Sequence, residues 1–259
     1  MSKFTLFTEC LNGEPLLPFW LKHHRDLFDH GVIILYPCKD NSEAIIREMC
    51  PRWEIVAPIK NPHYDCAGVD REVMIQESRH AGWKMALNIT EFAVTQSLAE
   101  VVNSVPPRTR CILPMDVAVM VDTPDTVNEE LDPNIPLLVQ KHHGLFSQNY
   151  PLWKCRHARQ LHRGGHGKYD VGRHNSGVKP QSQSPLLYIS WFVWSPYNII
   201  RSRKLEVQKQ LSQTDLIAKR GWQHLVTLKE QDARFVKVSR MAYDLNKNYG
   251  YRTASRRIG

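Results

Sequence analysis

The chain has 259 residues, of which 42% are hydrophobic, with only 13 Gly and 16 Pro. This composition excludes a collagenous or disordered chain and supplies enough apolar side chains for a sizeable core. No run approaches the roughly 18 apolar residues of a membrane-spanning helix, and the N-terminus lacks a signal-peptide core, which together predict a cytoplasmic protein. The formal net charge of +8 favours a polyanionic partner: nucleic acid, an anionic membrane surface or a phosphate-bearing small molecule.

The first 56 residues alternate between strand and helix patterns. Residues 4–8 alternate apolar and polar side chains, and residues 32–36 form the continuous apolar run of a buried strand. Between them, apolar residues recur at helical spacing over 16–28. A short helix at 44–49 and a strand at 53–56 follow. Strand, helix, strand, helix, strand in this order predicts a parallel α/β sheet.

The middle of the chain continues this alternation, and the end becomes helical. A helix pattern from residue 68 leads into a strand at 85–89, and residues 180–185 read as a turn-rich separator. Further strands are expected at 110–115, 118–121 and 186–194, and helices over the last sixty residues. The sequence therefore predicts one α/β domain with a helical C-terminal extension.

Two segments account for the net positive charge of the chain. Residues 154–179 carry seven Lys or Arg and four His against one acid, with no hydrophobic period. Residues 237–259 carry six basic residues against one acid, so the remaining chain is close to neutral. The first segment is expected to be a loop, either solvated or acting as a mobile lid whose Arg and Lys close over a diphosphate. The spacing of the potential zinc ligands in this segment matches no standard zinc-site pattern.

Polar side chains follow three of the predicted strands. Glu14 comes after the first strand, Asp40 after the second, and residues 88–91 after the strand at 85–89. Ligands of open α/β sheets bind at the carboxyl ends of strands, so these groups are candidates for one binding site. The alternative is that Glu14 and Asp40 only cap helices.

Several of these segments resemble one enzyme family. The stretches 12–24, 28–31 and 40–42, followed by GWKMALNITEF at 82–92, are similar to family 2-type glycosyltransferases with the GT-A fold. Gly-Arg-His at 172–174 and the region 194–205 are also similar to small members of this family, so the resemblance spans about residues 3–230. It implies a mixed, mostly parallel sheet flanked by helices, with a catalytic domain at 1–196 and a helical extension at 197–259.

The resemblance implies transfer of a sugar from a nucleotide-sugar donor to a hydroxyl of a glycan or glycoconjugate acceptor. It places Glu14, Asp40, Lys84, Asn88 and Arg173 at the donor. The basic C-terminus could in addition touch an anionic membrane surface. A carboxylate base is expected near the acceptor, and Asp122, at the end of a predicted strand, is the first choice. The alternative is that Asp122 only begins a turn.

In this family two aspartates of a D-x-D motif hold a divalent cation, Mn²⁺ or Mg²⁺, on the donor diphosphate. Here the matching positions are Asn88 and Thr90, and only Glu91 keeps a carboxylate. Three interpretations remain, in this order. Thr90 and Glu91 hold the cation with His174, or Lys and Arg replace the cation, or activity has been lost.

Two other functions compete with a glycosyltransferase. One is a basic nucleic-acid-binding protein, although residues 154–179 contain only Tyr169 as an aromatic residue and no nucleic-acid motif is present. The other is a catalytically inactive, glycosyltransferase-like binding protein, suggested by Asn88 and Thr90.

Overall fold

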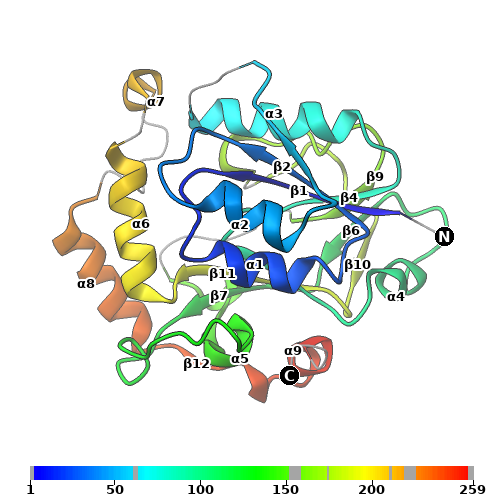
Figure 1. Ribbon diagram of the computed structural model, residues 1–259. Helices are drawn as coiled ribbons and strands as arrows, with labels where there is room; N and C mark the ends of the chain where they lie inside the picture. Colours follow the sequence, from blue (N-terminus) through cyan, green and yellow to red (C-terminus); the bar gives the residue numbers. More distant parts are fainter. Residues whose placement is uncertain are drawn as a thin grey trace.

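The computed structural model describes residues 3–60, 64–151, 159–173, 175–209, 212–218 and 226–255. The predicted α/β class is confirmed: helices flank two sheets, the larger of them mostly parallel (Figure 1). None of the described helices is long and apolar enough to cross a membrane.

The first sheet has seven strands in the order β10-β6-β9-β4-β1-β2-β3, and its neighbours are parallel except for the two pairs that β9 makes. Strand β1 is buried throughout, as expected for a central parallel strand with helices on both faces. The strands are β1 (Phe4–Cys10), β2 (His30–Leu35), β3 (Glu54–Val56), β4 (Trp83–Ala86), β6 (Cys111–Pro114), β9 (Leu161–Arg163) and β10 (Ser182–Ser184).

The second sheet has five strands in the order β12-β8-β7-β11-β5. Only β7 and β11 are parallel, and the other pairs are antiparallel. The strands are β5 (Glu91–Val94), β7 (Val117–Val121), β8 (His143–Phe146), β11 (Tyr188–Trp194) and β12 (Tyr243–Asp244). Because β4 and β5 are joined by residues 87–90, the end of the first sheet runs directly into the second.

Helices cover both faces of the first sheet (Figure 1). Leu6 of β1 packs in one core cluster with Trp20, whereas Phe7 packs in another with Val73, because successive strand residues point to opposite faces. The helices are α1 (Leu17–His24), α2 (Ser42–Met49), α3 (Cys66–Ser78), α4 (Leu98–Asn103), α5 (Leu137–Gln140), α6 (Tyr197–Lys209), α7 (Gln213–Ile217), α8 (Leu228–Ser239) and α9 (Tyr249–Ser255). Short 3-10 turns are η1 (Ser147–Asn149), η2 (Val171–Arg173) and η4 (Leu245–Lys247).

The segment expected to be a loop is built into the sheet. Strand β9 lies between β4 and β6, and β10 forms where a turn-rich separator was expected. Arg159, His162 and Arg173 are buried, so these basic residues belong to the interior instead of a solvated surface. The expectation of a loop is therefore wrong for residues 161–163, whose strand forms through pairs with residues far away in the sequence, whereas most other described residues of this segment lie outside helices and strands.

The described residues after 196 are mostly helical, as expected, and include the two-residue strand β12. Helices α6 and α8 lie together at one end of the molecule, and α9 lies beneath the second sheet (Figure 1). Tyr251 and Ala254 of α9 belong to the main core cluster, and β12 pairs with β8. A division of the chain at residue 196 stays a prediction.

Candidate functional site

A cavity of about 350 Å³ lies at the carboxyl ends of β1 and β4, beside β11 and α6. Its size is in the range of small-molecule sites, and its place is where open α/β sheets bind ligands. The chain segments before β9 and around η2 close one side. The polar residues on its wall are Glu9, Tyr64, Cys66, Asp70, Asn88, Thr90, Arg159, Trp191, Arg203 and Lys204.

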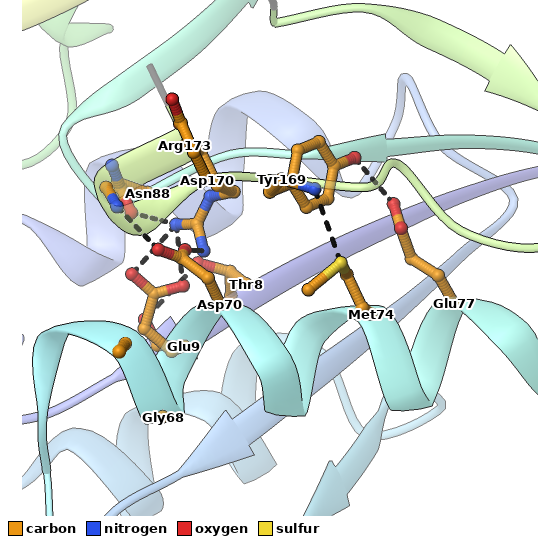
Figure 2. A network of polar contacts seen from close by, with 12 residues as sticks. Thr8, Glu9, Gly68, Asp70, Met74, Glu77, Asn88, Tyr169, Asp170 and Arg173 are labelled. Atoms are coloured by element: carbon orange, nitrogen blue, oxygen red, sulfur yellow. Dashed lines mark hydrogen bonds and ion pairs between the residues drawn. The ribbon is translucent and has the colours of Figure 1, made fainter. Parts of the chain in front are cut away.

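Arg173 forms the centre of a buried network beside this cavity (Figure 2). Its Nη2 donates to both carboxylate oxygens of Glu9 at 2.8 and 2.9 Å, and its Nη1 donates to Asp70 Oδ1 at 2.8 Å. Nη2 also donates to Asn88 Oδ1. Glu9 ends β1, Asp70 lies in α3 and Asn88 follows β4, so one guanidinium joins three elements of the fold.

The charges of this network determine the pKa values of its members. Burial raises the pKa of Asp70 to about 6, although Arg173 opposes the shift. Burial alone would lower the pKa of Arg173, but the carboxylates of Glu9 and Asp70 outweigh it and raise that pKa above its usual value. Arg173 therefore stays charged at every working pH.

A second arginine pairs with the carboxylate that was expected to hold a metal. Arg159 Nη2 lies 2.6 Å from Glu91 Oε1, and both side chains are buried. The other oxygen of Glu91 accepts a hydrogen bond from the backbone N–H of Asn88 at 2.8 Å. Both oxygens of Glu91 are thus engaged by donors from the protein.

These residues do not fit a divalent cation. Such a cation needs oxygen ligands with free lone pairs. Among the described residues, the carboxylates of Glu9, Asp70 and Glu91 all accept hydrogen bonds from arginine, and Thr90 offers one neutral hydroxyl. A metal ion here would have to displace two guanidinium groups, so the second interpretation, in which Arg and Lys replace the metal, agrees better with the geometry.

Helix α6 adds two further cations to the cavity wall. Arg203 and Lys204 make no ion pair with any described residue, and Lys204 Nζ lies 4.1 Å from the centre of the Trp194 ring. Burial, assisted by the charge of Arg234, lowers the pKa of Lys204 to about 8. Arg203 Nε and Arg159 Nη1 are buried without a hydrogen-bond partner. The cavity therefore offers positive charge and free donors to an anionic ligand.

The structure brings some of the predicted site residues together. Asn88 and Thr90 line the cavity, and Arg173 and Glu91 lie next to it through their contacts with Asn88. His174 lies outside the described residues.

Glu14 and Asp40 lie close to one another but outside the cavity lining. The carboxylate of Glu14 accepts from the side chain and backbone of Asn41, and Asp40 accepts from the backbone N–H of Glu14 at 3.0 Å. Asp40 also accepts from Ser42 at the start of α2. These contacts join the turns after β1 and β2. The capping alternative fits Asp40 in part, since it accepts from the first residue of α2, but Glu14 does not cap the helix that follows it.

Lys84 is also away from the cavity. Its ammonium donates to the backbone carbonyls of Glu77, Gly164 and Gly165, and burial lowers its pKa. The carboxylate of Glu77 also accepts from His162 of β9. It accepts in addition from the hydroxyl of Tyr169 in the segment after β9, which is held in the same place (Figure 2). Lys84 therefore anchors the polypeptide that carries Arg173.

Asp122 has a capping position at the start of α6. Its carboxylate accepts from Ser195 Oγ at 2.7 Å and from the backbone N–H of Tyr197 at 2.8 Å, and Lys141 Nζ lies 3.4 Å away. The side chain is buried and is not part of the cavity lining. Burial raises its pKa. This geometry supports a structural role for Asp122, as the cap of α6 and not as the start of a turn, over the predicted role as base.

Sequence reasoning missed several residues of the site. Glu9 was part of a strand end but was not selected, and Asp70 carries no local signal beyond its position on one helix face, seven residues before Glu77. Arg159 was one of seven basic residues in a segment without a pattern. Arg203 and Lys204 look like surface residues of a helix, and only the three-dimensional fold shows that they line a cavity.

The chain matches no protein-family model and no curated protein. Among solved structures, glucosyl-3-phosphoglycerate synthase from Mycobacterium tuberculosis, a GT-A fold enzyme, matches over 62% of this chain and 57% of its own, with 9% identity and a TM-score of 0.38. A structure of that enzyme with Mn²⁺ and UDP-glucose matches over 44% of this chain and 43% of its own, with 8% identity and a TM-score of 0.34.

A 4-diphosphocytidyl-2C-methyl-D-erythritol synthase matches over 52% of this chain and 70% of its own, with 9% identity and a TM-score of 0.31. The chain thus spans less than two thirds of the length of the M. tuberculosis enzyme. At such low similarity no residue role is transferred from these proteins, and function is inferred from the cavity of this chain alone.

Proposed function

We propose that the chain is a glycosyltransferase that takes a sugar from a nucleoside-diphosphate sugar, with arginine and lysine side chains in place of a metal ion. The observation that carries this proposal is the cavity at the carboxyl ends of β1 and β4, whose wall holds Arg203 and Lys204 without acidic partners. A diphosphate supplies the negative charge that such a wall lacks.

The chemistry follows from where charge develops. When the sugar leaves, negative charge builds on the departing nucleoside diphosphate, and cations fixed in a dry cavity stabilise it. Lys204 supplies a point charge and Arg203 a planar donor, while the partnerless Nη1 of Arg159 gives a third contact. Trp191 supplies an aromatic ring on the same wall, suited to a base or a sugar face.

Arg173 has a different part in this proposal. Because its guanidinium is already shared by Glu9, Asp70 and Asn88, it neutralises the acidic end of the cavity and does not bind the donor itself. Without it, the carboxylates of Glu9 and Asp70 would repel a diphosphate placed nearby.

A binding protein without turnover is a second candidate. The carboxylates of Glu9, Asp70 and Glu91, in or beside the cavity, are each held by an arginine, so none of these three is free to act as a base toward an acceptor hydroxyl. The nucleic-acid alternative loses support because Arg159 and Arg173 are buried. Contact of the basic C-terminus with a membrane and a cytoplasmic location stay predictions.

The test is to incubate the full chain with UDP-, GDP- and dTDP-sugars, in EDTA or in Mn²⁺, and to measure nucleoside diphosphate release. Release in EDTA that is lost in Lys204→Met and Arg203→Met supports the proposal. The matched control is Lys209→Met, on the same helix but exposed and paired with Glu206. Donor binding without release points to the binding protein, and release only with Mn²⁺ contradicts the metal-free site.

A further inference from the structure

Three side chains that are potential metal ligands meet at the edge of the first sheet opposite the cavity. His30 begins β2, Glu54 begins β3, and His80 lies two residues beyond α3, which packs over β1 and β2. The cavity lies at the carboxyl ends of parallel strands, whereas these residues lie at the amino ends of β2 and β3. The cluster is therefore separate from the proposed donor site.

The ligand atoms are already close together. His30 Nε2 lies 2.8 Å and His80 Nε2 3.4 Å from Glu54 Oε1, and all three atoms lie within 4.8 Å of one another. In a tetrahedral zinc site with bonds of about 2.0–2.1 Å, neighbouring ligand atoms are roughly 3.4 Å apart. Small rotations of the side chains therefore suffice to enclose an ion.

The hydrogen bonds of His80 define which of its nitrogens faces the cluster. His80 Nδ1 lies 2.8 Å from the carbonyl oxygen of Gln76, and because a carbonyl only accepts, Nδ1 carries the proton. In the neutral ring Nε2 then presents a lone pair toward the carboxylate of Glu54. A proton or a metal ion on Nε2 completes the contact with this carboxylate, and metal-ligating histidines commonly donate their other N–H to a backbone carbonyl in this way.

We propose that His30, Glu54 and His80 bind a first-row divalent metal ion, with zinc as the best fit. Two imidazoles and one carboxylate suit Zn²⁺, Co²⁺ or Ni²⁺, whereas Mg²⁺ and Ca²⁺ prefer oxygen ligands only. The side chains of both histidines are 16% exposed and that of Glu54 is 49% exposed, so an ion can enter from solvent and keep a water as its fourth ligand.

The bound ion would join the side chains of β2, β3 and the segment after α3, in addition to the backbone pairing of β2 with β3 and the contacts of the Glu54 carboxylate with both histidines. Since a ligand that binds only the folded state stabilises it, Zn²⁺ is expected to raise the unfolding temperature of the chain. The ion has no part in the proposed sugar transfer, because the cavity lies at the other edge of the sheet.

The test is to titrate the full chain with Zn²⁺ by calorimetry and with Co²⁺ by visible absorption. One equivalent is expected to bind with a tetrahedral Co²⁺ spectrum, and Glu54→Gln and His80→Gln are each expected to weaken this binding by at least about 10-fold. The matched control is His142→Gln, from a histidine pair near Asp244 that lacks this convergence of three ligand atoms.

The unfolding temperature of each variant in EDTA shows whether it folds, and Glu54→Gln is the safer change because Glu54 is half-exposed. Equal Zn²⁺ affinity in wild type, Glu54→Gln and His80→Gln would overturn the proposal, as would the absence of any Zn²⁺ binding. Loss of the site with nucleotide binding unchanged is the expected result, so this test is independent of the proposed transferase activity.

Discussion

Arg173 Nη2 lies 2.8 and 2.9 Å from the two carboxylate oxygens of Glu9 and also donates to Asn88, one of the two positions that match the D-x-D motif. The same arginine donates to Asp70, so its side chain links β1, α3 and η2. Arg173 is a cation that the chain itself supplies, and it occupies the carboxylates around it. They hold Arg173 and are not available to a divalent cation.

Removing this guanidinium should lower the free energy of unfolding. Arg173→Met leaves Glu9 and Asp70 buried without a counter-charge, and breaking such a pair typically costs about 3–5 kcal/mol of unfolding free energy. Chemical denaturation measures the loss. The triple variant Glu9→Gln, Asp70→Asn, Arg173→Met should recover part of it, because it removes the stranded charges as well. A triple variant no more stable than Arg173→Met would show that charge is not the cause.

Lys204 is expected to strengthen nucleotide binding and to lower the free energy of unfolding. Its folded pKa of about 8 is below the usual lysine value, so the folded state holds this proton less tightly than the unfolded chain does. At pH 7 this charge therefore destabilises the fold, and the cost decreases from about pH 8 upward until it is lost above the ordinary lysine pKa of about 10.4. Lys204→Met should raise unfolding free energy at pH 7 by on the order of 1–3 kcal/mol while abolishing nucleotide binding.

The same pKa predicts how binding depends on pH. Between pH 7 and pH 9 wild-type affinity for a nucleoside diphosphate should fall by about tenfold, because Lys204 loses its proton in the free protein. Lys204→Arg keeps its charge and should show a nearly flat profile. Fluorescence titration across this range gives both curves, and parallel curves would exclude Lys204 as a ligand of the diphosphate.

Lys84 is expected to act on the site from a distance. Lys84→Met leaves the carbonyls of Glu77, Gly164 and Gly165 without their donor, at a cost of about 1–3 kcal/mol. Backbone amides around β9 and η2 should exchange with solvent faster in this variant. Hydrogen exchange monitored by mass spectrometry tests this, with β7 as the internal reference. An equal increase in the exchange rate around β9 and η2 and in β7 would indicate global destabilisation instead.

Substitution of Asp122 distinguishes a structural role of this residue from a role as catalytic base. As the cap of α6, Asp122→Asn should lower unfolding free energy by about 1–3 kcal/mol through weakened bonds to Ser195 and Tyr197. Once the variant is folded, nucleoside diphosphate release should be close to the wild-type rate. A folded variant that binds donor normally but releases no diphosphate would restore the catalytic role predicted from the sequence.

The part of the fold that sequence predicts well is the part that local patterns determine. Strands β1 and β2 and helix α1 follow from period-2 alternation, an apolar run and helical spacing within a few residues. Strand β9 has only three residues, and it forms because β4 and β6, about 80 and 50 residues earlier in the chain, offer open edges on both sides. No local pattern contains that information.

The residues of the site also fall into those that local sequence patterns indicate and those that they do not. Asn88 and Thr90 lie in the cavity lining, and the sequence pointed to them because the strand end and the family motif coincide there. Their roles stay predictions. The partner of Glu91 was not predictable, since Arg159 lies 68 residues away in a segment crowded with basic residues. Buried ion pairs depend on three-dimensional neighbours, so a sequence shows which charges exist but not which of them neutralise each other.

The most direct measurement is calorimetric titration of the full chain with UDP, GDP and dTDP in EDTA, compared with the corresponding nucleosides. The account predicts that at least one diphosphate binds without metal, that its nucleoside binds far more weakly, and that Arg203→Met and Lys204→Met each reduce the affinity for the diphosphate at least tenfold. Binding that appears only when Mn²⁺ is added, or that is unchanged in both variants, would contradict it.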